Sequence, residues 1–84
     1  MGVTIGMPTH EEAAMLMKRI REAFAAESVG LQSLVELRPM GIRAQAVATR
    51  EQRRRIVRNL YGSGIVMVDL GPASYGFAVR RQAN

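Results

Sequence analysis

The chain has 84 residues, no cysteine and a formal net charge of +5. The lack of cysteine excludes a disulfide framework, a thiolate nucleophile and a cysteine-type zinc site. Twelve Lys and Arg residues against seven Asp and Glu favour a polyanion or an acidic protein surface as the partner. We expect one domain, 1–84, in the cytoplasm, because the first residues carry no export signal and no stretch approaches the roughly 18 apolar residues that span a bilayer.

The sequence contains a pseudo-repeat of a helix followed by two strands. Thr9 and Thr49 each precede a helical pattern, and each helix leads to a similar strand ending, at 34–39 and at 67–72. We place the two units at about 9–48 and 49–81. Each unit has one apolar face that it cannot bury alone, so the two are expected to close a common core.

In the first unit, Thr9 and Glu12 form a capping box that begins a helix over 10–27. The segment 28–30 ends this helix, since Gly30 supplies a residue that is free to adopt a positive φ. Alternating apolar residues then predict a hairpin with strands over 31–38 and 42–47 and a turn over 39–41. Before the unit, Val3 and Ile5 indicate a short first strand.

In the second unit, Thr49 and Gln52 repeat the capping box. A narrow apolar stripe of Ile56, Val57 and Leu60 runs along a helix that ends at the glycines of 62–64. A phosphate-binding loop is excluded here, because such loops place their glycines before a helix. Strands follow over 65–70 and 75–80, and 81–84 is expected to be a loose tail.

These elements predict an α+β two-layer sandwich, with two helices on one face of a mostly antiparallel four- or five-stranded sheet. The order (β)αββαββ resembles a ferredoxin-like sandwich with one added strand. The alternation of the strands turns a partly apolar face away from the helices, and such a face on a small protein predicts a homodimer. The residues expected on this dimer or partner face are Leu34, Val47, Ile65 and Met67.

The segment Tyr75-Gly76-Phe77 resembles the aromatic part of the RNA-recognition-motif signature, in which the aromatic side chains stack on bases. The sequence departs from that signature at Ala73, Ser74 and Arg80. The alternation of this strand favours a core position for both aromatic residues, and a base-stacking platform is the alternative.

Catalytic chemistry has little support. The only histidine, His10, lies at the start of the first helix and is interpreted as structural. Glu36 and Asp69 are related by the repeat and are the one carboxylate pair that could meet across the sheet, although two solvated strand residues are the favoured interpretation. Met15 and Met17 are expected to fill the core. We expect no enzyme activity, cofactor, metal site or small-molecule substrate.

The strongest functional signal is the arginine-rich second helix. Arg50, Arg54 and Arg58 follow one another at four-residue spacing and form a ridge, which Arg55 flanks. Only Glu51 offers local compensation, by pairing with Arg55. Guanidinium groups match the oxygens of phosphates and carboxylates. The predicted binding residues are Arg50, Arg53, Arg54, Arg55, Arg58 and Arg43.

Two functions follow from this ridge. The first is a non-enzymatic nucleic-acid-binding protein that contacts phosphates through its second helix. The second is a protein-protein module that docks the ridge on an acidic partner. Small phage or mobile-element inhibitors of host nucleic-acid-binding complexes, such as CRISPR effectors or polymerases, are of this kind, which is an argument by analogy.

Overall fold

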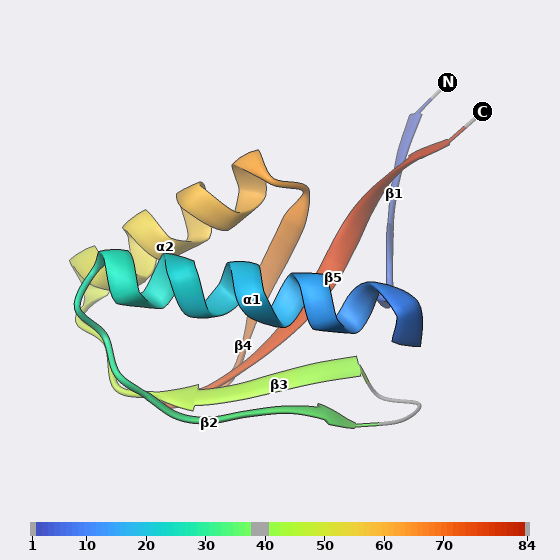
Figure 1. Ribbon diagram of the computed structural model, residues 1–84. Coiled ribbons are helices and arrows are strands. Elements are labelled where there is room, and N and C mark those ends of the chain that lie inside the picture. The colour runs from blue at the N-terminus through green and yellow to red at the C-terminus, as the bar shows by residue number, and fades with distance from the viewer. Residues whose placement is uncertain (1, 38–40, 84) are drawn as a thin grey trace.

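The structure is a computed structural model that describes residues 2–37 and 41–83. Two helices lie over one face of a single antiparallel sheet, as Figure 1 shows, so the predicted α+β class is confirmed. The elements are β1 (Gly2–Gly6), α1 (His10–Ala26), β2 (Leu31–Leu37), β3 (Gly41–Ala46), α2 (Arg50–Gly62), β4 (Ile65–Gly71) and β5 (Ser74–Ala83).

The longest strand, β5, is the centre of the sheet. It pairs with β4 along one edge, and along the other edge it pairs first with β3 and then with β1. The strand β2 completes the sheet outside β3. The last strand of the chain, β5, therefore occupies the middle of the sheet, and β1 pairs with β5 alone.

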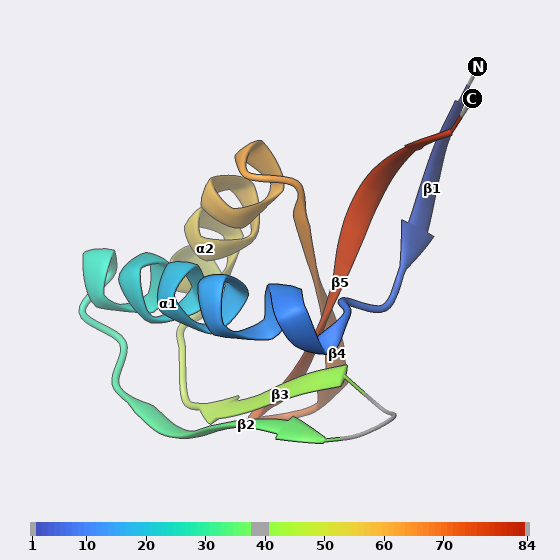
Figure 2. The same cartoon turned by 45° about the vertical axis from the view of Figure 1, so that its right-hand side comes forward.

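The end of the chain is a strand up to Ala83, so the expectation of a loose tail is wrong for 81–83, while Asn84 lies outside the described residues. The reason is that β1 pairs with 79–83 of β5 beyond the end of β3. Figure 2 shows the result, an arm of two strands that carries both chain ends past the rest of the sheet.

The two helix-strand-strand units meet through their last strands. Residues 42–45 of β3 pair with 74–77 of β5, which joins the β2-β3 hairpin to the β4-β5 hairpin. Both helices begin with the predicted capping box. The Thr9 amide donates to Glu12 Oε1 at 2.8 Å, and the Thr49 amide donates to Gln52 Oε1 at the same distance.

Both helices also end in the same way, with one residue of positive φ. That residue is Ser28 in the first unit (φ 58°) and Gly64 in the second (φ 79°), so Gly30 does not have the role predicted for it. After α1 the Val29 amide donates to the Phe24 carbonyl at 2.9 Å, which is the bond of a Schellman motif. Glycine is the residue type that a positive φ favours, and the second unit has it at Gly64, whereas the first unit has Ser28 at the same position.

The core between the helices and the sheet is entirely apolar among the described residues. Its centre is a contact between the units, in which the rings of Phe24 on α1 and Tyr75 on β5 lie 6.3 Å apart. Tyr75 and Phe77 both face the helices and are buried, so the base-stacking alternative for this strand is excluded. The helices contribute Ala13, Leu16, Ile20, Ala23, Phe24, Ile56 and Leu60 to this core.

We predicted that Leu34, Ile65 and Met67 point away from the helices. This prediction is wrong, because all three side chains lie on the helix side of the sheet. Ile65 and Met67 are 3% and 9% exposed and belong to the core, and Leu34 packs against it. The physical reason is the hairpin register, which sets Ile65 beside Val79 and Met67 beside Phe77. Directly paired residues share a face, so β4 must bury these two side chains.

Val47 is exposed, but it lies one residue past the end of β3. Pro39 and Met40 of the predicted turn, and Arg38 at the expected end of the preceding strand, lie outside the described residues. Gly41 begins β3 with a φ of 88°.

We predict that Ser28→Gly raises the free energy of unfolding by about 1 kcal/mol, and that Gly64→Ser lowers it by about the same amount. Each change acts on a position of positive φ, where a side chain is disfavoured. A Cβ at Gly64 would meet only the Arg80 carbonyl oxygen, at 3.9 Å, so backbone strain alone should be responsible. Urea unfolding curves measure both effects.

Gly30→Ala is the control, because Gly30 has no positive φ and a Cβ there would meet nothing within 4 Å. Its stability should stay equal or rise slightly. A greater loss from Gly30→Ala than from Gly64→Ser would contradict this assignment of the helix ends.

Candidate nucleic-acid interface

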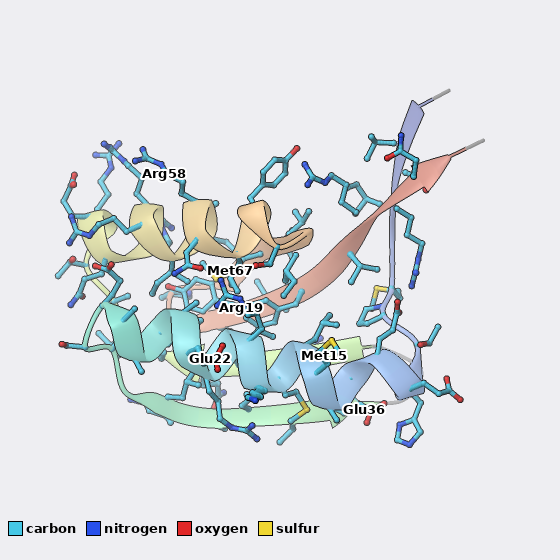
Figure 3. All side chains as sticks on the ribbon, turned by 45° about the horizontal axis from the view of Figure 1, so that its top comes forward. Met15, Arg19, Glu22, Glu36, Arg58 and Met67 are labelled. Carbon is cyan, nitrogen blue, oxygen red and sulfur yellow. The ribbon has the colours of Figure 1, made fainter. Side chains whose placement is uncertain are left out.

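Packing against α1 and the sheet fixes which side of α2 faces outward. Ile56 and Leu60 are fully buried beneath the helix. On the side toward α1, Gln52 Nε2 donates to the Glu27 carbonyl at 3.1 Å. Near the other end, Arg19 of α1 donates to the Ser63 hydroxyl at 3.1 Å and to Asn59, and Figure 3 shows Arg19 between the two helices. The helices therefore run antiparallel and are tied together near both ends of α2.

Two of the five arginines on α2 are held by acidic residues from other elements. Arg53 donates to Asp69 of β4 at 2.7 Å, and Arg55 donates to Glu27 at 2.6 Å. The hydrogen bond and charge of Glu27 raise the pKa of Arg55 above its usual value. The predicted pair of Glu51 with Arg55 is present at 3.8 Å, but Glu27 is the closer partner. No local pattern predicts the pair with Glu27, which is 28 residues away.

The other three arginines lie in a row on the exposed side of α2, and we call Arg50, Arg54 and Arg58 the arginine face. Arg54 lies 3.8 Å from Glu51, in a pair whose side chains are both more than half exposed. Within the described part of the chain, Arg50 and Arg58 form no ion pair or side-chain hydrogen bond. Figure 3 shows Arg58 on the outer side of α2, away from α1. Four residues of helix rise about 6 Å, so the row spans about 12 Å.

An aromatic side chain continues the arginine face toward the end of α2. Tyr61 is three residues after Arg58 and is 48% exposed. The guanidinium carbon of Arg80, from β5, lies 4.5 Å from the centre of the Tyr61 ring. This pair was not predicted, although the spacing from Arg58 places Tyr61 on the same side of the helix.

Arg43 does not belong to the arginine face. It lies on β3, where it is paired with Val35 on one side and Gly76 on the other. It alternates with the buried residues Ile42 and Ala44, so its side chain leaves the sheet on the face opposite to the helices. The structure therefore brings five of the six predicted binding residues together on α2 and separates the sixth.

A groove of about 480 Å³ lies between α1, the turn after α2 and the second half of β5. Leu16, Ile65 and Val79 contribute apolar surface to it. Met15 also lines it and is 76% exposed, so the prediction that Met15 fills the core is wrong. The charged residues around the groove are Glu12, Lys18, Arg19, Glu22, Arg80 and Arg81.

An ion pair connects α1 to the end of β5 at one side of this groove. Arg81 donates to both carboxylate oxygens of Glu12, at 2.7 and 3.1 Å, and to the Met7 carbonyl at 3.2 Å. The bonds from Arg81, together with the capping bond to the Thr9 amide, lower the pKa of Glu12 to about 2. Glu12 thus belongs to both the helix cap and the contact between the two units.

The carboxylates that the repeat relates do not meet. Glu36 of β2 lies beside His10, at 2.8 Å from Nδ1, and Asp69 of β4 binds Arg53. The two strands are separated by β3 and β5. Among residues 2–37 and 41–83 there is no cluster of potential metal ligands, and no helix long and apolar enough to cross a membrane.

No protein-family model, curated protein or solved structure was found that matches this chain.

The stability of the protein should depend on pH through Glu12. Its folded pKa is depressed, so its carboxylate stabilises the fold above the pKa of the unfolded chain, and this contribution is lost as the pH falls toward 2. Glu12→Gln keeps a side chain that can form the capping box but removes the charge. Wild type should therefore be the more stable protein at pH 6, and the difference should vanish near pH 2.

Thermal unfolding from pH 2 to pH 7 measures this difference, and Glu51→Gln is the control because Glu51 has only pairs at 3.8 Å. A difference between wild type and Glu12→Gln that stays constant over the whole pH range would contradict the assigned ion pair.

Proposed function

We propose that this protein is a non-enzymatic nucleic-acid-binding protein that contacts phosphates through the arginine face of α2. The observation that supports this proposal is that only some of the arginines on α2 are held closely by carboxylates. Arg53 and Arg55 are bound to carboxylates at less than 3 Å, whereas Arg50 and Arg58 point outward with no acidic partner among the described residues. Like charges at four-residue spacing repel one another, so a bound anion would stabilise this row.

The length of the row supports an extended anion rather than a single phosphate. Three guanidinium groups spread over about 12 Å can contact successive phosphates along a strand. Such contacts fix the position of a nucleic acid and do not read its sequence. Binding should therefore depend strongly on salt and only weakly on sequence.

Tyr61 and Arg80 suggest how a single strand could be held at the end of the row. An exposed aromatic ring provides a surface on which a base can stack, and the guanidinium of Arg80 already lies over that ring. We therefore propose that Tyr61 contributes to the binding of single strands and does not contribute to the binding of duplexes. A chain without cysteine suits a reducing compartment, and we place this activity in the cytoplasm.

We expect that replacing any one of Arg50, Arg54 and Arg58 by Gln weakens binding to all sequences about equally. On duplex DNA, the slope of log affinity against log salt should decrease by about 0.9 for each phosphate contact removed. Fluorescence anisotropy with labelled duplex and single-stranded oligonucleotides of mixed sequence, from low to moderate salt, measures affinity and slope together.

Arg53→Gln is the matched control, because it removes one charge from the same helix at a residue that Asp69 already holds. It should leave the salt slope almost unchanged. Tyr61→Ala should weaken only single-strand binding, and Tyr61→Phe should restore it. No binding to DNA or RNA at low salt would overturn the proposal and leave an acidic protein surface as the ligand of the arginine face.

A further inference from the structure

The groove between α1, the turn after α2 and the second half of β5 begins where α2 ends. The two helices run antiparallel, and α1 has 17 residues whereas α2 has 13. Arg19 donates to Ser63, which directly follows α2, so the first half of α1 extends past the end of that helix. Figure 1 shows this difference in length. The groove therefore lies over the part of α1 that α2 does not reach.

Arg80 connects the groove to the exposed aromatic side chain at the end of α2. It lines the groove, and its guanidinium carbon lies 4.5 Å from the centre of the Tyr61 ring. Its amide donates to the Gly64 carbonyl at 2.8 Å, which holds the turn after α2 against β5. Tyr61 itself is on the same side of α2 as Arg58. The arginine face, the pair of Tyr61 with Arg80 and the groove thus follow one another.

The groove has an apolar floor and a cationic rim. Leu16, Ile65 and Val79 form the floor and are each less than 10% exposed, and Met15 lies at its edge. Among the described residues that line the groove, four are cations and two are acidic, which leaves two positive charges. This combination favours a ligand that has an apolar body and carries negative charge.

Two of the four cations on the rim form no ion pair with a described residue. Arg81 is bound by Glu12, and Arg19 is held by the end of α2 and the turn after it. Lys18 is exposed on α1, and neither it nor Arg80 has an acidic partner in the described part of the chain. These two side chains can therefore bind an anion without breaking an existing ion pair.

We infer that the groove is a second part of the nucleic-acid site, which takes the bases of a single strand, an inference that rests on the proposed function. The bases of a single strand expose apolar faces that can pack on apolar side chains, and Lys18 and Arg80 contact its phosphates. A duplex keeps its bases paired and stacked, so it binds the arginine face alone. The groove follows α1 from Glu12 to Glu22, about 15 Å, which adds to the 12 Å of the arginine face.

Lys18→Gln should weaken the binding of single strands and leave the binding of duplexes almost unchanged. On single strands, the slope of log affinity against log salt should decrease by about 0.7, the value for one phosphate contact. Fluorescence anisotropy with labelled single-stranded and duplex oligonucleotides of mixed sequence measures both quantities. Arg21→Gln is the matched control, because Arg21 is also exposed on α1 but does not line the groove, and it should change neither.

Met15→Ala should weaken single-strand binding several-fold without changing the salt slope, and Val47→Ala, at a side chain of similar exposure outside the groove, should not. If Lys18→Gln binds single strands as tightly as wild type while Arg54→Gln loses affinity, this inference fails and the proposed function stands. Equal losses of Lys18→Gln on single strands and duplexes would also refute the groove as a single-strand site. A wild-type protein that binds no oligonucleotide at low salt would overturn both.

Discussion

The pairing of β3 with β5 is the interaction on which the rest of the structure depends. Each helix-strand-strand unit has a helix and a hairpin with one apolar face, and neither unit has enough apolar surface to enclose a core alone. The pairing of β3 with β5 joins the two hairpins in one sheet, so that both helices lie on the same side of it. The contact of Phe24 with Tyr75 then joins the helix of the first unit to the last strand of the second.

This arrangement also determines which charges remain available for a partner. Once the sheet places α2 beside α1 and β4, Glu27 and Asp69 come within reach of Arg55 and Arg53. The exposed side of the helix keeps the row from Arg50 to Arg58.

The sequence predicted most of the fold, because its strongest signals are local. The capping boxes at Thr9 and Thr49 depend on residues three positions apart, and α1 has a clear helical period. The phase of β4 was not predictable from its own sequence, since Ile65, Val66, Met67 and Val68 are apolar on both faces. It follows from pairing with β5, where Phe77 and Val79 alternate with Gly76 and Ala78.

The candidate site was predictable only in part, for the same reason. The spacing of Arg50, Arg54 and Arg58 is local and correctly placed them on one side of α2. The partners of Arg53, Arg55 and Tyr61 come from β4, from the cap that follows α1 and from β5, so no local pattern contains them. The strand after residue 80 escaped prediction because its partner, β1, lies at the other end of the chain.

Native-state amide hydrogen exchange tests the central role of the β3-β5 ladder most directly. If neither unit is stable alone, the amides of 42–45 and 74–77 should exchange only through global unfolding, with the same free energy in both strands. That shared value should equal the free energy of unfolding from urea denaturation. Exchange of the β2-β3 hairpin through a partial opening that leaves β4 and β5 protected would contradict the account, because the first unit could then separate while the second stays folded.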